Sequence, residues 1–312
     1  MTTTGTTTFN LDMNDLIEEA FERCGMELRS GYDFRTARRS LNLLTIEWAN
    51  RGINLWTVEQ GQLLMNTGQA IYPIPVDTID LLDTVVRQYN GESTNQIDIN
   101  ISRISESTYL TIPNKNALGR PIQVWYNRQS GNTSVIPQTT LAEAITSADQ
   151  TTITLTSVAN LPTQGFVNIG SETIGYQNIV GNQIVNAWRG QNGTTAAASV
   201  ASGTDVYNNN LPCINVWPTP NAPGNQYTFV YYRMRRIQDA GNGVRTEDIP
   251  FRFINCMAAG LAYHLSMKLP GVQDNRIVML KADYEQQWQL AADEDRETAA
   301  LRVVPRNMFY YR

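Results

Sequence analysis

The pattern of apolar positions predicts two helices near the start of the chain. The apolar stripe of the first helix consists of Ile17, Ala20, Phe21 and Cys24. Either Asp12 or Asn14 can cap its start, and Gly25 lies near its end. The stripe of the second helix, which starts at about Asp33, consists of Ala37, Leu41, Leu44 and Trp48. Gly52 suits the position after this helix, because glycine readily adopts the left-handed conformation of a helix end.

Strand-like runs follow the two helices and predict a β domain. The runs are residues 55–65, 70–74, 84–89 and 121–128, and later residues 213–217 and 227–233. Pro73 and Pro75 indicate a turn or an edge strand, because proline has no N–H to donate to a neighbouring strand.

Residues 132–211 differ in composition from the segments on either side. Their charged residues are Glu143, Asp149, Glu172, Arg189 and Asp205, and the segment has no Lys or Met. Short alternating runs cover residues 152–156, 166–169, 173–176 and 183–188. Gly181-Asn182 between two of these runs predicts a hairpin. We expect a small all-β, barrel-like module inserted into the β domain, with its two ends close together.

The chain becomes helical again after the second group of strands. One helix, with Pro250 near its start, carries Phe253, Met257, Leu261 and Leu265. Pro270-Gly271 ends it, and a longer helix has on one face Ile277, Leu280, Tyr284, Trp288 and Ala291. The pattern predicts an α+β fold, in which N- and C-terminal helices form a body with an antiparallel β domain that the module interrupts.

These elements predict a division of the chain into four parts. Residues 1–8 form a flexible tip, residues 9–131 with 212–300 form the body, residues 132–211 form the module, and residues 301–312 form an arm. The arm is basic and apolar, and its residues include Arg302, Val303, Val304, Pro305, Arg306, Met308, Phe309, Tyr310, Tyr311 and Arg312. Such a terminus is a sticky patch on a single molecule. We expect it to dock on a partner; the alternative is that it folds back on its own body or pairs with a neighbouring subunit.

Composition and charge exclude several classes of function. The net charge is −5, and no block of Lys and Arg is large enough to hold DNA through its phosphates. The chain has no apolar run long enough to span a membrane. Cys24, Cys213 and Cys256 match no metal motif, and we interpret Cys24 and Cys256 as small core residues.

The sequence carries no recognisable catalytic, cofactor or metal site. His264 is the single histidine and lies in an apolar helical run, which predicts a structural or solvent-facing role. No phosphate-binding loop of the GxxxxGK[ST] type occurs, and the glycines after Arg189 are interpreted as turn residues. The carboxylates Glu18 and Glu19, and those at residues 293–295, are predicted to lie on solvated helix faces.

Arg233, Arg235 and Arg236 form the densest basic cluster, directly after an aromatic run. One interpretation is the exposed edge of a strand. The other is a contact between subunits, since Arg and Tyr are enriched at interfaces.

Several separated motifs resemble one family when their order is considered. They are the helix through Trp48-Ala-Asn-Arg-Gly52 to Leu55-Trp56, then Tyr72-Pro-Ile-Pro, Ser102-Arg-Ile-Ser105, Gly119-Arg-Pro121, Val216-Trp-Pro-Thr-Pro-Asn221 and Ile249-Pro250. In this order they resemble the podovirus head-to-tail adaptor family, also called tail tubular protein A or the connector adaptor. The module resembles small β modules of phage tail proteins through Thr151-Thr-Ile-Thr-Leu155, Gly170-Ser-Glu-Thr-Ile-Gly-Tyr176 and Arg189-Gly-Gln-Asn-Gly-Thr-Thr-Ala-Ala-Ala198.

The resemblance implies a structural protein of the virion that is made in the host cytoplasm. It implies a twelve-fold homo-oligomeric ring between the portal protein and the tail nozzle protein, with DNA passing through the lumen without specific binding. The arm is then expected to reach the portal, and the module to contact tail fibres or neighbouring subunits. No enzyme activity, cofactor or membrane contact is implied.

Two other functions compete with the adaptor. One is a tail-fibre or spike attachment protein whose β module binds a ligand. The other is a cell-wall hydrolase carried in the tail. A ring, a trimeric rod and activity on peptidoglycan would distinguish the three.

We predict that the protein binds duplex DNA weakly. A neutral or acidic wall facing the DNA repels phosphates and avoids tight binding that would stall ejection, and the negative net charge is consistent with such a wall. Gel shifts at physiological salt should show little complex. A submicromolar Kd would contradict this prediction.

Overall fold

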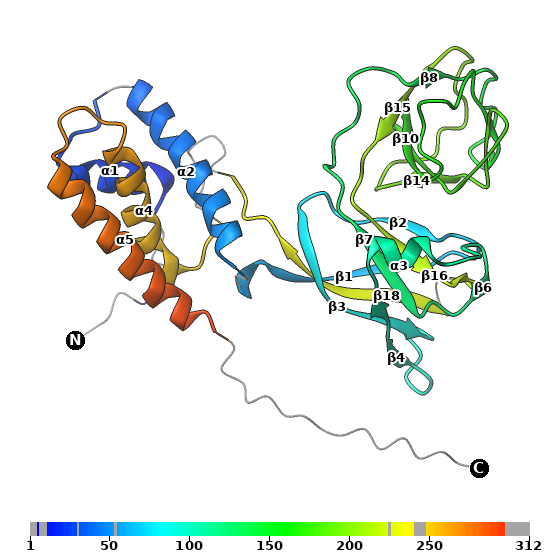
Figure 1. Ribbon diagram of the computed structural model, residues 1–312, viewed down its shortest axis with the longest axis horizontal. Helices are drawn as coiled ribbons and strands as arrows, with labels where there is room; N and C mark the ends of the chain where they lie inside the picture. The colour runs from blue at the N-terminus through cyan, green and yellow to red at the C-terminus, as the bar shows by residue number, and fades with distance from the viewer. Residues whose placement is uncertain are drawn as a thin grey trace. The chain divides into compact units, whose positions relative to one another are not determined.

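The computed structural model describes residues 5, 11–29, 31–52, 55–223, 226–239 and 248–296. Almost all of the predicted tip and the whole predicted arm lie outside the described residues. The described chain forms two compact units (Figure 1). One comprises the described parts of Met1–Thr57 and Ile237–Arg312, and the other comprises Val58–Arg236. The predicted α+β class is confirmed, with terminal helices that pack together and antiparallel sheets between them in the sequence.

The first unit, called the helical unit here, is built from both ends of the chain. Its elements are α1 (Met13–Cys24), α2 (Gly31–Arg51), η1 (Leu55–Thr57), η2 (Phe251–Phe253), α4 (Ile254–Ser266) and α5 (Asp274–Glu294). Asp12 caps α1 by accepting hydrogen bonds from the backbone N–H groups of Asn14 and Asp15, at 2.8 and 2.9 Å. Gly25, with φ 76°, ends it in the left-handed conformation.

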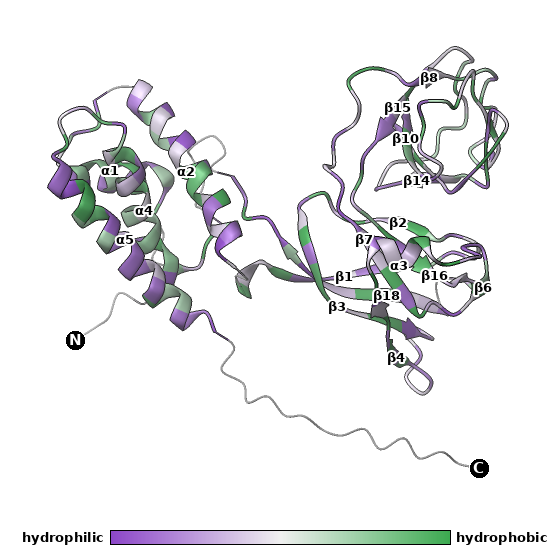
Figure 2. Cartoon of the chain, viewed as in Figure 1, coloured by the Kyte–Doolittle hydropathy of each residue, from purple (hydrophilic) through white to green (hydrophobic). Residues whose placement is uncertain are grey.

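Helix α4 is the centre of the helical unit. The other three long helices, α1, α2 and α5, all contact it, and most of its residues are buried. Figure 2 shows α4 coloured as hydrophobic, whereas α2 and α5 carry hydrophilic stretches. The ring of the fully buried Trp48 packs against those of Phe253 and Trp288, with centroids 5.5 and 5.2 Å away. Cys24 and Cys256 are buried free thiols in the same core, as predicted.

The second unit, called the β unit here, contains two four-stranded sheets that share one core. In hydrogen-bonded order, the strands of the first sheet are β1 (Val58–Leu64), β18 (Tyr227–Arg235), β3 (Thr78–Gln88) and β4 (Ile97–Asn100). Those of the second are β2 (Ile71–Pro73), β16 (Cys213–Trp217), β7 (Gln123–Asn127) and β5 (Ser102–Arg103). Two smaller features complete this part: α3 (Glu106–Leu110) and the pair β6 (Leu118–Gly119) with β17 (Thr219–Pro220).

Most predicted strands of the shared core are present, with shifted ends. The prediction that Pro73 marks an edge is confirmed, because β2 is the outer strand of its sheet. The run expected over residues 55–65 begins as a strand at Val58, since Leu55–Thr57 form the 3-10 helix η1. The run expected over residues 84–89 belongs to the longer strand β3.

The segment between β7 and β16 forms a further group of strands with a core of its own. One sheet consists of β14 (Trp188–Gln191), β11 (Glu172–Tyr176), β10 (Gly165–Ile169), β15 (Asp205–Asn209) and β8 (Thr139–Thr140). The other consists of β12 (Asn178–Val180), β13 (Gln183–Val185) and β9 (Ile153–Thr154). The core contains Ile153, Val167, Ile174, Tyr176, Ile184 and Val206 among others, all from this segment.

The hairpin at Gly181-Asn182 is confirmed, but its first strand was assigned wrongly. The two residues join β12 to β13, in which Val180 pairs with Gln183. The run at residues 173–176 instead lies in β11, between β10 and β14. The short run Asn178–Val180 was missed because it has one polar and two apolar residues and therefore no alternation to detect.

We predict that Gly260→Ala destabilises the helical unit although alanine favours helices. A Cβ at Gly260 would lie 2.9 Å from Tyr284 and 3.0 Å from Leu44, so α2 and α5 approach α4 closely at this glycine. Overpacking should outweigh the gain in helix propensity and cost about 1–2 kcal/mol. Unfolding followed by circular dichroism at 222 nm measures the change. Adding Leu44→Val should recover part of the loss; a Gly260→Ala variant more stable than the parent would contradict the prediction.

Candidate functional site

The three arginines proposed as a subunit contact lie at the end of strand β18. Arg233 donates to Asp77 Oδ1 at 2.6 Å and to Glu59 Oε2 at 2.9 Å. Arg235 donates to Glu59 Oε1 at 2.6 Å. Arg236 donates to the backbone oxygen of Val76 at 2.9 Å.

These contacts lie inside the β unit and tie β18 to β1 and to the turn before β3. The side chains of Arg233 and Arg235 are only 11% and 12% exposed, so the expected exposed strand edge is wrong. Strand β18 lies between β1 and β3, and its Arg side chains are neutralised by carboxylates of β1 and of the turn before β3. Burial works against the charge of Arg233, but Asp77 and Glu59 outweigh it and raise the pKa of Arg233 above its usual range. The subunit contact itself stays a prediction.

These ion pairs join the first and last strands of the β unit, where the chain enters and leaves it. Strand β1 begins this unit and β18 ends it, and the two pair antiparallel from Val58↔Met234 to Leu64↔Thr228. Gly61 pairs with Tyr231, whose ring occupies the space that a Cβ on residue 61 would need.

The arm residues at 301–312, the other predicted interface, lie outside the described residues.

The single histidine belongs to a polar network in the helical unit that the sequence did not reveal. Glu47 of α2 accepts from Arg51 Nη2 at 2.6 Å and from the Tyr284 hydroxyl at 3.0 Å, and its other oxygen is 3.1 Å from His264 Nε2. Trp48 Nε1 donates to the Tyr284 hydroxyl at 3.0 Å. The network therefore ties α2 to α4 and α5, and the predicted structural role of His264 agrees with these contacts.

The environment fixes the charge state of this network. Burial alone would raise the pKa of Glu47, but hydrogen bonds from Arg51, Tyr284 and His264 outweigh it and hold the pKa below its usual range. Burial, together with the charge of Glu47, raises the pKa of Tyr284. Glu47 thus remains an acceptor and Tyr284 a donor. The spacing of Glu47 and Arg51, four residues apart on one helix, is a sequence signal that could have predicted this one pair of the network.

One carboxylate of the acidic run at residues 293–295 contradicts the predicted solvated face. Asp295 is buried, accepts from the backbone N–H of Leu55 at 2.9 Å and pairs with Arg252. Asp295 therefore joins the end of α5 to η1 and η2. Asp293 does pair with the exposed Arg296. Glu18 is exposed, and Glu19 pairs with Arg23 at 2.7 Å.

Two of the motifs that carry the module's resemblance, those at Gly170–Tyr176 and at Arg189, meet in a buried ion pair. Glu172, 1% exposed, accepts from Arg189 Nε at 2.7 Å and Nη2 at 2.6 Å. The same carboxylate accepts from the backbone N–H groups of Gly190 and Ala197, both at 2.9 Å. Arg189 also donates to the backbone oxygens of Ser147, Gln150 and Ala197. A carboxylate and a guanidinium with all these bonds satisfied hold the module's loops together.

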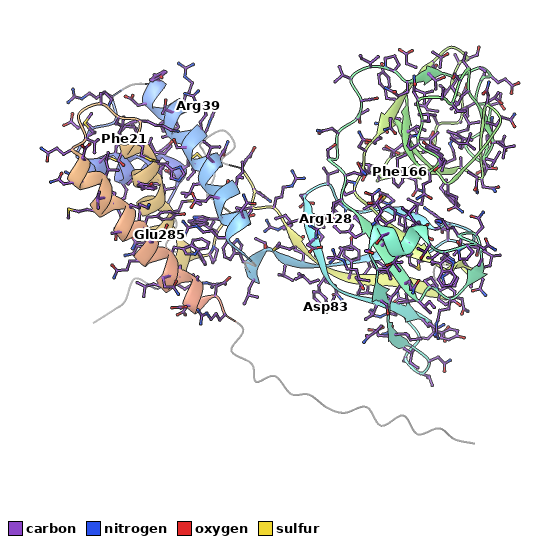
Figure 3. All side chains as sticks on the ribbon, in the orientation of Figure 1. Phe21, Arg39, Asp83, Arg128, Phe166 and Glu285 are labelled. Atoms are coloured by element: carbon purple, nitrogen blue, oxygen red, sulfur yellow. The ribbon has the colours of Figure 1, made fainter. Side chains whose placement is uncertain are left out.

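The module contacts the two-sheet part of the β unit through a small apolar cluster and several amides. Phe166 of β10 is buried against Ile71, Leu211 and Cys213, and Figure 3 labels it at the side of the module that faces the other strands. Gln164 Nε2 donates to Asn215 Oδ1 at 3.1 Å, and the backbone N–H of Ala70 donates to Gln177 Oε1 at 3.1 Å. Beside Phe166 lies a cavity of about 270 Å³, lined mainly by amide side chains such as Asn127, Gln164 and Asn209.

The described residues contain no group of three or more His, Cys, Asp or Glu side chains placed to hold a metal ion. No helix in the described part of the chain is long and apolar enough to cross a membrane. A scan against protein-family models finds none that matches the chain, and a search of curated proteins finds no significant match.

We predict that Glu172→Gln destabilises the module at neutral pH. Burial alone would raise the pKa of Glu172, but bonds from Arg189, Ala197 and Gly190 hold it below the usual range. A lowered folded-state pKa contributes stability above the unfolded value of about 4.3, and that stability is lost as pH falls through the folded pKa. Leaving Arg189 buried without its partner should cost about 3 kcal/mol at pH 7.

Hydrogen exchange of β10, β11 and β14 in the full-length chain measures this cost. Exchange should be roughly a hundredfold faster in the variant at pH 7, and the difference should shrink below about pH 4. The exposed Glu143→Gln in the same module is the control and should change exchange little. Equal exchange in Glu172→Gln and the parent would refute the structural role of the pair.

Proposed function

We propose that this protein is a structural head-to-tail adaptor of a short-tailed bacteriophage. In this proposal it forms a homo-oligomeric ring of twelve copies between the portal protein and the tail nozzle protein, and DNA passes through the lumen. Its place is the virion, after synthesis in the host cytoplasm.

One observation carries the proposal beyond the sequence motifs. Helices α1, α2 and α5 pack around α4. In the sequence the β unit lies between α2 and α4, and a further β segment is inserted between β7 and β16. This is the combination of a helical body and a β domain that the resemblance to adaptors implies. The order of the matching motifs along the chain supports the same proposal.

The use of the polar residues also favours a structural role. Glu47 binds both His264 and Tyr284. Glu172 is saturated by Arg189 and two backbone N–H groups. These polar side chains thus join helices in one unit and loops in the other.

A fibre or spike attachment protein is the alternative that one feature favours. The amide-lined cavity beside Phe166 is of a size and polarity that a small polar ligand would fit. Its walls include residues of the module and of β2 and β16, so a ligand there would engage the module directly. Within the adaptor proposal, this module contacts tail fibres or neighbouring subunits.

Electron microscopy of the protein mixed with the portal protein of the same phage tests the proposal. We predict ring-shaped classes stacked on the portal ring. A chain truncated after Ala300, which lacks the basic and aromatic arm, should fold but bind the portal at least tenfold more weakly, because docking of several aromatic side chains is lost. Trimeric rods would favour fibre attachment, and activity on peptidoglycan would favour the hydrolase; either result without rings would overturn the adaptor.

A further inference from the structure

The helical unit carries a groove between α1 and the start of α4. Its volume is about 780 Å³, and its apolar wall includes Leu11, Ile254 and Ala258. The residues of α1 that line the groove are Asp15, Glu18, Glu19, Glu22 and Arg23. Glu19 pairs with Arg23, whereas the carboxylates of Asp15, Glu18 and Glu22 form no ion pair within the described chain. The groove therefore combines apolar surface with three free negative charges.

The spacing of these carboxylates places them in one line. Asp15, Glu18 and Glu22 are separated by three and four residues, so they fall within an arc of about 60° on α1. Along the helix axis they are about 4.5 and 6 Å apart. A partner with cations at the same spacing on one helix face could pair with them.

Helix α2 presents such a face on its outer side. Its buried residues include Ala37, Leu41, Leu44 and Trp48, which pack into the core of the unit. On the opposite side, within an arc of about 80°, lie Tyr32, Arg35, Arg39, Leu43 and Ile46. Tyr32, Leu43 and Ile46 are 64%, 53% and 58% exposed. Figure 3 shows Arg39 extending from α2 away from the other helices.

The two arginines of this face match the groove in charge and spacing. Arg35 and Arg39 are exposed, lie about 6 Å apart along the axis, and form no salt bridge with any described residue. The apolar side chains that flank them, Tyr32, Leu43 and Ile46, can pack against the apolar residues that line the groove. Among the described residues, Arg39 donates only to the Thr36 hydroxyl, at 3.3 Å. Exposed apolar residues on a helix face that bears arginines without salt bridges are typical of an interface rather than of a solvated surface.

The face cannot enter the groove of its own unit. Both α1 and α2 pack on α4, and the buried side of α2 faces that core. The outer face of α2 therefore points away from the core that lines the groove. A second copy of the chain can bring the two together.

We propose that the outer face of α2 in one copy docks in the α1–α4 groove of the next copy. Arg35 and Arg39 pair with Asp15, Glu18 and Glu22, and Leu43 and Ile46 pack against the apolar wall. The two surfaces differ, so the contact is head-to-tail and repeats from copy to copy, as a closed ring requires. The inference rests on the proposed function and deepens it, because it names the surfaces that join the ring.

Cysteine cross-linking of the full-length chain tests this contact. Glu18→Cys and Arg39→Cys are introduced together, and the three native thiols are buried and protected from a bismaleimide. The double variant should give a ladder of linked multimers, alone at high concentration or bound to the portal. An equal mixture of the two single variants should give linked dimers and nothing larger, because each chain then carries one introduced thiol. Absence of Glu18–Arg39 links in both the free and the portal-bound protein would overturn the proposal.

Charge reversal provides the matched control. Arg39→Glu should lower the yield of assembled particles in sedimentation at least tenfold, and Glu18→Arg in the same chain should restore part of it. Lys281→Glu, which reverses an exposed cation on α5, should have little effect. An equal loss from Lys281→Glu would show a general charge effect and would contradict the specific pairing.

Two further outcomes separate this inference from the proposed function. Rings on the portal without Glu18–Arg39 links would reject the contact and keep the adaptor. A ladder of links without portal binding would keep the contact and reject the adaptor.

A third variant, Tyr310→Cys, tests another occupant of the groove. Links from Glu18→Cys to Tyr310→Cys, at the expense of those to Arg39→Cys, would show that the basic C-terminal segment fills the groove and would overturn the docking of α2.

Discussion

The structure depends on one constraint: each inserted part must begin and end on neighbouring antiparallel strands. The helical unit is made from both ends of the chain, so the β unit has to leave it after Thr57 and return before Ile237. Pairing of β1 with β18 meets this requirement, and the ion pairs of Glu59 with Arg233 and Arg235 fasten the two strands. The same arrangement recurs inside the β unit, where Asn127 of β7 pairs with Cys213 of β16 on either side of the inserted segment.

The inserted segment is held together with few charged residues. Its two ends are fixed by strands of the neighbouring sheet, and its interior is closed by an apolar core with one saturated ion pair, Glu172–Arg189. An ion pair buried this deeply contributes little net stability when intact, but removal of one partner costs about 3–5 kcal/mol because the other charge stays buried. The helical unit uses Glu47 in a comparable way, since one carboxylate there joins three helices.

Helices and long strands could be predicted from the sequence because their apolar periodicity is local. The buried stripe of α5 and the strand Cys213–Trp217 follow from that pattern. The ends of α1 follow from residue type instead: Asp12 was one of two candidate caps, beside Asn14, and Gly25 was placed near the end. The long-range polar contacts could not be predicted: Glu47 and His264 are far apart in the sequence, and nothing local marks Asp295 as buried among acidic neighbours. Arg233 was expected at a strand edge, because a sequence does not show that β1 from the other end of the unit covers β18. Short strands such as β8 and β17 gave no detectable alternation.

A ring protein needs two different surfaces that fit each other, and the helical unit offers an acidic groove on α1 and a basic, apolar face on α2. The number of copies that assemble on a portal tests the proposed adaptor function directly. Native mass spectrometry of the complex between the full-length chain and its portal measures that number directly. We predict twelve copies of this chain for each portal ring. A complex with three copies, or a chain that stays monomeric beside an intact portal ring, would contradict the adaptor.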